Sequence, residues 1–271
     1  MPEFAHKGLR ASYRRWGDGP RLVLLHAGGS HGGQWTKVAE ALAPERLSIA
    51  PDLIGCGATD PWPVPGALMQ DDQADLVAAL VETTGGGPVD IVGHSYGGAV
   101  AVRLAVKHPE MVRSLIVIEP ILTCLLGEVG DPIFKEGESV NRRFVAAIES
   151  GQPECGWQEF LDARNGAGTW DRMSDERRRG FLAQTAQARD TLYSNLNNPT
   201  TLADCGAIGV PMTIGCGETT TPADRRTTEV LRDAIPAARY EIICGAGHMS
   251  PLSHPQEVVR LIRAHLERAV R

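Results

Sequence analysis

Short apolar runs alternate with amphipathic segments along most of the chain. The apolar runs end at small or polar residues and span residues 21–26, 47–52, 89–94, 114–119, 211–217 and 238–245. Runs of this kind are typical of strands that are buried on both faces of a sheet. Apolar residues at helical spacing lie between them, over residues 71–83, 97–108, 230–235 and 256–269. This alternation predicts an α/β fold with a mostly parallel central sheet and helices on both of its faces.

The alternation is interrupted between the fourth and fifth of these runs. Residues 121–205 contain no strand pattern, but helical stretches occur at 141–150, 157–163 and 174–196 and carry many of the aromatic residues. A segment of this length is too long for a connecting loop. We therefore expect a helical cap over residues 121–205, inserted into a core domain of residues 1–120 and 206–271. The alternative is a pair of crossover helices with long joins.

Composition and charge narrow the class of protein. The 271 residues are 42% hydrophobic and 22% charged, which is ordinary globular usage and excludes wholesale disorder. The net charge of −6 argues against a nucleic-acid partner. No apolar run approaches the roughly 18 residues of a membrane span, and the N-terminal residues lack a signal-peptide pattern. The six cysteines are scattered singly, without metal-ligand spacing. We expect a cytoplasmic protein with reduced thiols, no membrane association, no metal and no cofactor.

The strongest chemical motif follows the third apolar run. Residues 93–97 read Gly-His-Ser-Tyr-Gly and match the pattern G-x-S-x-G, with a predicted strand before it and a predicted helix after it. Such a sharp turn exposes the hydroxyl of Ser95 and leaves no room for side chains at Gly93 and Gly97. It also places the Tyr96 N–H at a helix N-terminus, where unpaired donors favour negative charge. The motif predicts that Ser95 is a nucleophile.

Further motifs lie in a consistent order along the chain: His26-Ala27-Gly28-Gly29 after the first run, Asp52 to Gly57 after the second, and Gly245-Ala246-Gly247-His248 after the last. With the serine motif, they resemble the α/β-hydrolase superfamily over nearly the whole chain. The resemblance implies that the N–H groups of Gly28 and Tyr96 form an oxyanion hole. Ala27 stands where that superfamily usually has glycine.

The general base is expected among the eight histidines of the chain. This fold orders its triad as serine, acid, histidine, so the base should lie late in the sequence. His248 follows the last predicted strand in a Gly-Ala-Gly loop, whereas His254 precedes a proline at a helix start. We therefore predict that His248 is the base.

The acid of the triad is harder to predict. Thr220 occupies the position at which most relatives carry an aspartate, and threonine cannot stabilise an imidazolium by charge. Glu119 ends the strand after the serine motif, where some subfamilies of this superfamily carry their acid, and it should face the same end of the sheet as Ser95. We predict Glu119 as the acid, with Glu218 as the alternative.

These residues together predict acyl transfer to water. A serine at position 95 excludes the relatives with an aspartyl nucleophile, which leaves hydrolysis of a small or medium apolar ester or lactone. The alternatives are a C–C bond hydrolase, a cofactor-free haloperoxidase or perhydrolase, and a low-turnover ligand receptor on the same fold. Candidate pocket residues are His31, Trp157, Trp170 and Phe181, although the aromatic residues could equally be packed inside the cap and His31 could face solvent. The oligomeric state is not predicted.

Overall fold

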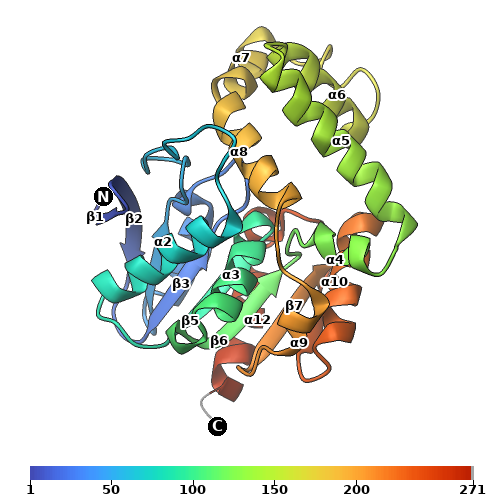
Figure 1. Ribbon diagram of the computed structural model, residues 1–271. Coiled ribbons are helices and arrows are strands. Elements are labelled where there is room, and N and C mark those ends of the chain that lie inside the picture. Colours follow the sequence, from blue (N-terminus) through green and yellow to red (C-terminus); the bar gives the residue numbers. More distant parts are fainter. Residues whose placement is uncertain (270–271) are drawn as a thin grey trace.

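One twisted sheet runs through the computed structural model, which describes residues 1–269 apart from the side chains of residues 136, 164 and 165 (Figure 1). Its strand order is β1-β2-β4-β3-β5-β6-β7-β8. The strands are β1 (Glu3–His6), β2 (Leu9–Trp16), β3 (Arg21–Leu25), β4 (Leu47–Pro51), β5 (Val89–His94), β6 (Val112–Ile118), β7 (Met212–Gly217) and β8 (Arg239–Ile243). The pairs β1–β2 and β2–β4 are antiparallel, and the others are parallel. The predicted α/β class with a mostly parallel sheet is confirmed.

Helices cover both faces of this sheet. They are α1 (Thr36–Leu42), α2 (Gln70–Thr83), α3 (Tyr96–Lys107), α4 (Thr123–Glu128), α5 (Pro132–Glu149), α6 (Pro153–Asn165), α7 (Asp175–Ala183), α8 (Thr185–Leu196), α9 (Leu202–Gly206), α10 (Pro222–Ala234), α11 (Ser250–Ser253) and α12 (Pro255–Ala269). Short 3-10 turns, η1 (Gly32–Trp35) and η2 (Pro109–Met111), precede α1 and β6.

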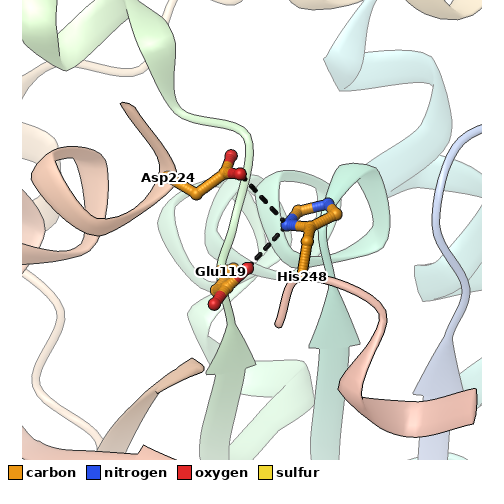
Figure 2. Close-up of side chains that lie close together, drawn as sticks. All are labelled: Glu119, Asp224 and His248. Carbon is orange, nitrogen blue, oxygen red and sulfur yellow. Dashed lines mark hydrogen bonds and ion pairs between the residues drawn. The ribbon is translucent and has the colours of Figure 1, made fainter. Parts of the chain in front are cut away.

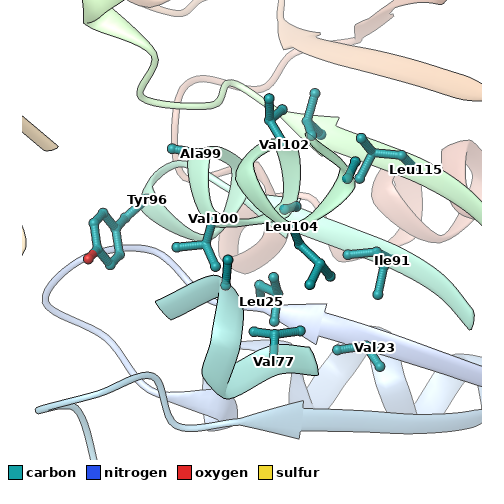
Figure 3. Packing of buried hydrophobic residues seen from close by; sticks show 14 of the residues in the cluster. Val23, Leu25, Val77, Ile91, Tyr96, Ala99, Val100, Val102, Leu104 and Leu115 are labelled. Carbon is teal, nitrogen blue, oxygen red and sulfur yellow. The ribbon is translucent and has the colours of Figure 1, made fainter. Parts of the chain in front are cut away.

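The side chains of β3 point alternately into two hydrophobic cores, one on each face of the sheet. Leu22 and Leu24 pack on one face with residues of α1 and α12. Val23 and Leu25 pack on the other face with residues of α2 and α3 (Figure 3). Complete burial of each such side chain stabilises the fold by roughly 1.5–3 kcal/mol. The parallel strands are thereby held in register, so the loops at their carboxyl ends converge at one edge.

Between β6 and β7 the described chain forms helices only. Figure 1 shows α5, α6 and α7 standing apart from the sheet, while α8 returns toward it. Phe144, Trp157, Leu161 and Trp170 form a separate apolar cluster among these helices. We call residues 123–206, from α4 to α9, the helical insertion.

Two elements differ from the sequence expectation. The stretch 174–196 forms two helices, α7 and α8, which meet at Gln184. The break lets Phe181 turn toward Trp157, with ring centroids 4.9 Å apart, while α8 crosses onto the core. The strands β1, at the edge of the sheet, and β2, next to it, were not predicted, because they are antiparallel strands with exposed polar residues rather than apolar runs.

Within the described residues, no helix combines the length and the apolar character needed to cross a lipid bilayer.

Candidate active site

The turn between β5 and α3 places Ser95 in a strained conformation. Its φ and ψ are 56° and −117°, a region that residues other than glycine rarely occupy. The flanking glycines make the turn possible: a Cβ on Gly93 would overlap the Gly97 carbonyl, and one on Gly97 would overlap the carbonyls of Leu25 and His26. Strain of this kind costs about 1–3 kcal/mol and persists only where the surrounding structure enforces it. The surrounding backbone therefore fixes the direction of the Ser95 hydroxyl.

The loop after β8 brings His248 onto this serine. Its Nε2 lies 3.0 Å from Ser95 Oγ, and its Nδ1 lies 2.6 Å from Glu119 Oε2. With the proton on Nδ1, the ring donates to the carboxylate and accepts from the serine hydroxyl. This is the hydrogen-bond order that a serine nucleophile needs. Glu218 does not contact the imidazole, because its carboxylate accepts the backbone N–H of Gly245 at 2.7 Å.

Glu119 is held in place by the segment that follows β7. Its φ of 43° turns the side chain back from the end of β6. Oε1 accepts the Gly217 N–H at 2.6 Å, and Oε2 accepts the Thr220 hydroxyl at 2.9 Å. Burial alone would raise the pKa of Glu119, but the hydrogen bonds from His248, Gly217 and Thr220 outweigh it and lower the pKa. Thr220, at the position where the acid was sought, thus supports a carboxylate that comes from another strand.

A second carboxylate approaches the same imidazole nitrogen. Asp224, near the start of α10, has Oδ2 3.5 Å from His248 Nδ1 (Figure 2). Its side chain is 29% exposed, whereas that of Glu119 is fully buried. The ligand atoms of Glu119, Asp224 and His248 lie within 4.8 Å of one another, but a cation there would compete with the short His248–Glu119 hydrogen bond. Hydrogen bonding and opposite charge are therefore enough to explain why both carboxylates lie beside His248 Nδ1.

Two backbone N–H groups point into the site without an internal acceptor. Within residues 1–269, the N–H groups of Gly28 and Tyr96 make no hydrogen bond to the protein. The neighbouring Ala27 N–H is used instead by Gln34, whose Oε1 accepts it at 3.1 Å. The two free donors are available to stabilise a negative oxygen beside Ser95.

A buried chain of side chains links this loop to the loop of His248. Gln34 Nε2 donates to His94 Nδ1 at 3.1 Å, and His94 Nε2 donates to the backbone carbonyl of His248 at 2.7 Å. Burial and the nearby His248 lower the pKa of His94 to about 3, so its ring stays neutral. Through Gln34, which also accepts the Ala27 N–H, one network holds both loops.

A cavity of about 330 Å³ opens above Ser95 between the core and the helical insertion. Its core side contains Gly28, Ser95, Tyr96 and His248, and the insertion adds an aromatic wall and a more polar helix face. The wall consists of Phe144, Trp157, Phe160 and Phe181.

Two of the four predicted pocket residues lie elsewhere. His31 is exposed, and its Nδ1 accepts the Gly33 N–H at the start of η1. Trp170 is 5% exposed inside the apolar cluster of the insertion, with its ring 6.4 Å from that of Phe181. Neither residue lines the cavity above Ser95: His31 caps the η1 turn, and Trp170 packs inside the apolar cluster of the insertion. Trp157 and Phe181 do line the cavity.

Sequence reasoning did not identify Gln34, His94 or Asp224 as parts of the site. His94 lies within the serine motif, so its position could have suggested a role. Gln34 and Asp224 carry no comparable signal, because their contacts form only when distant segments meet.

The comparisons with known proteins agree with this fold. The model of the Alpha/beta hydrolase family matches residues 22–261. Pimeloyl-[acyl-carrier protein] methyl ester esterase of Chromobacterium violaceum is 31% identical over 269 residues, covering 93% of this chain and 96% of that protein. Lipase LipV of Mycobacterium tuberculosis is 41% identical over 109 residues, which is 40% of each chain. The structure of a thermophilic esterase from Thermogutta terrifontis superimposes with a TM-score of 0.76 at 22% identity, covering 98% of this chain and 97% of that one. The chain belongs to the alpha/beta hydrolase family.

Proposed function

We propose that the protein is a serine hydrolase that cleaves carboxylic esters or lactones through an acyl-enzyme on Ser95. The observation that carries this proposal is the continuous hydrogen-bonded chain from Ser95 through His248 to Glu119, facing the free N–H groups of Gly28 and Tyr96. The esterase and lipase relatives support hydrolase chemistry on this fold.

The first half of the reaction transfers the acyl group to the enzyme. His248 Nε2 accepts the Ser95 proton as Oγ attacks the substrate carbonyl, and the new oxyanion binds the N–H groups of Gly28 and Tyr96. Glu119 stabilises the imidazolium that forms. The C–O bond to the alcohol then breaks, and His248 returns the proton to the leaving oxygen. Loss of one oxyanion donor typically costs about 2.7–4 kcal/mol.

The second half releases the acid. Water takes the place of the alcohol, His248 accepts its proton, and the oxygen attacks the acyl carbonyl. Collapse of the second tetrahedral species breaks the bond to Ser95 Oγ, which recovers its proton from His248. Each step therefore uses the one histidine as base and then as acid.

The helical insertion is proposed to act as a cap that selects substrates by size. Its aromatic side chains form one wall of the 330 Å³ cavity, which suits a small or medium acyl group. A series of alkyl esters of increasing chain length tests both parts of the proposal. We expect multiple-turnover hydrolysis that declines above a medium chain length and disappears in Ser95→Ala; absence of turnover in the native protein would contradict it.

A further inference from the structure

One helix of the insertion presents a polar stripe to the otherwise apolar cavity. Gln184, which caps α8, and Thr191 and Asn195 within it are the polar residues of this stripe, and they line the cavity together with the apolar Ala188 and Leu192 of the same helix. Gln184 is exposed at one end of the stripe, whereas Asn195 is only 4% exposed at the other. The cavity therefore has an aromatic wall facing a row of hydrogen-bonding groups.

Asn195 has no partner within the described part of the protein. Its Oδ1 is fully buried and accepts no hydrogen bond, and its Nδ2 donates none. A buried amide left in this state is unfavourable, and most such groups in folded proteins are paired. Two neighbouring polar residues of α8 are satisfied: Ser194 accepts the Tyr96 hydroxyl at 3.0 Å, and Asp190 accepts the Gly66 N–H at 3.0 Å.

These same contacts fix the distance between Asn195 and the reacting serine. Ser194, next to Asn195, is bonded to Tyr96, which follows Ser95 directly. Thr191 lies against the oxyanion loop, since a Cβ built on Gly28 would come 3.1 Å from its methyl group. Asn195 is one helical turn further, about 6 Å along the helix axis. A substrate group that reaches Asn195 therefore lies a few bonds beyond the scissile carbonyl.

We propose, on the basis of the proposed function, that Asn195 binds a hydroxyl group of the acyl chain, so that the substrates are hydroxyacyl esters or the corresponding lactones. An amide side chain offers one donor and one acceptor side by side. Asn195 Oδ1 has almost no accessible surface, so the amide turns about its soft χ2 torsion when the ligand binds; a hydroxyl oxygen can then donate to Oδ1 and accept from Nδ2 at a single point. A trans secondary amide points its N–H and C=O in opposite directions and would satisfy only one of them.

A lactone leads to the same bound species as a hydroxy ester. When Ser95 attacks a lactone, the ring C–O bond breaks and His248 gives its proton to the released oxygen, which becomes a hydroxyl on the acyl chain. That hydroxyl remains tethered and can attack the acyl-enzyme again to close the ring. Hydrogen bonds from Asn195 would hold it away from the carbonyl while water completes the hydrolysis.

The test compares isosteric pairs of methyl esters in a pH-stat: each ω-hydroxy ester is paired with the alkyl ester in which a methyl group replaces the hydroxyl. The series is 4-hydroxybutanoate with pentanoate, 5-hydroxypentanoate with hexanoate, and 6-hydroxyhexanoate with heptanoate. In the native enzyme we expect kcat/KM to favour the hydroxy ester by roughly 10- to 100-fold at one chain length. δ-Valerolactone forms a second arm, which separates lactones from open hydroxy esters as the source of the hydroxyl.

Asn195→Leu removes both hydrogen-bonding atoms and keeps the branching and the number of side-chain heavy atoms. We expect the ratio of kcat/KM between hydroxy ester and alkyl ester to lose its preference for the hydroxy ester, whatever the absolute rates, and lactone hydrolysis to slow. Asn197→Leu, at an exposed position just beyond α8, is the matched control and should keep the preference. An equal hydroxyl preference in the native enzyme and in Asn195→Leu would overturn the inference. The inference would also be overturned if the native enzyme alone showed no hydroxyl preference at any chain length. If the alkyl esters are still hydrolysed in those cases, the proposed function stands; if no ester is turned over, both fail.

Discussion

Replacement of Glu119 by glutamine should disable the enzyme by placing the His248 proton on the wrong nitrogen. In the native site, Oε1 accepts the rigid Gly217 N–H, and Oε2 accepts His248 Nδ1–H and the Thr220 hydroxyl. The backbone N–H of Gly217 cannot turn, so the single oxygen of the amide must stay on that side. The NH₂ group then faces Nδ1 and Thr220. Thr220 can rotate its hydroxyl to accept, but Nδ1 can accept only if its proton moves to Nε2.

With Nε2 protonated, His248 cannot take the proton of Ser95. An equivalent change in a serine protease lowered kcat by ~10⁴, equal to about 5 kcal/mol of barrier. Asp224 remains 3.5 Å from Nδ1 and opposes the exchange, so we expect a loss of about 10³ to 10⁴ in Glu119→Gln.

Steady-state kinetics on a simple ester measure this loss, and ¹⁵N NMR of the histidine ring identifies the tautomer. Glu218→Gln is the matched control. Its side-chain oxygen can still accept the Gly245 N–H, so the loss should be ~10-fold or less, about 1.4 kcal/mol. The reasoning is refuted if Glu119→Gln keeps activity within ~10-fold of native, or if Glu218→Gln is the more damaged variant.

Three further predictions concern groups around the triad. Trp157→Ala should change the ratio of kcat/KM between short and long esters, because Trp157 lines the cavity. Trp170→Ala should mainly lower the melting temperature, because Trp170 is buried away from the cavity. Equal effects of the two variants on selectivity would contradict this prediction. Asp224→Asn removes a negative charge beside the His248 imidazolium, so the acid limb of the pH–rate profile should move to lower pH. The rate itself should fall by less than ~10-fold. An unmoved acid limb would count against a role for Asp224. Burial lowers the pKa of His26 to about 4 and that of His94 to about 3, so the unfolded chain binds more protons as the pH falls through 6.5. The free energy of unfolding should therefore fall by about 1.6 kcal/mol for each histidine between pH 6.5 and pH 5, and urea titrations with a flat pH dependence would disagree.

The central strands and the serine turn were predictable because local chemistry determines them. Strand β5 is buried throughout, and the glycines around Ser95 are required by contacts with nearby backbone, so the sequence pattern there reflects the structure directly. The antiparallel strands β1 and β2 were not predicted by the same reasoning. Their burial alternates and their polar residues face outward, so no apolar run marks them.

The surroundings of the triad were less predictable because they depend on contacts across long stretches of sequence. Glu119 was expected from its place at a strand end, but the support from Thr220 and the approach of Asp224 arise only when β7 pairs with β6 and brings the loop after β7 and the start of α10 to Glu119 and His248. Trp157 and Trp170 look alike in the sequence. Both belong to the apolar cluster of the insertion, and only the packing of its helices shows that Trp157 also lines the cavity while Trp170 does not.

The most direct test of the account is to locate the covalent bond that the proposed mechanism requires. The native protein is treated with a serine-reactive alkyl phosphonate and measured by intact-protein mass spectrometry, and the modified peptide is then sequenced. We predict one adduct per chain, located on Ser95, with no adduct in Ser95→Ala and slow labelling in Glu119→Gln. Absence of an adduct in the native protein, or an adduct that persists in Ser95→Ala, would contradict a nucleophilic Ser95.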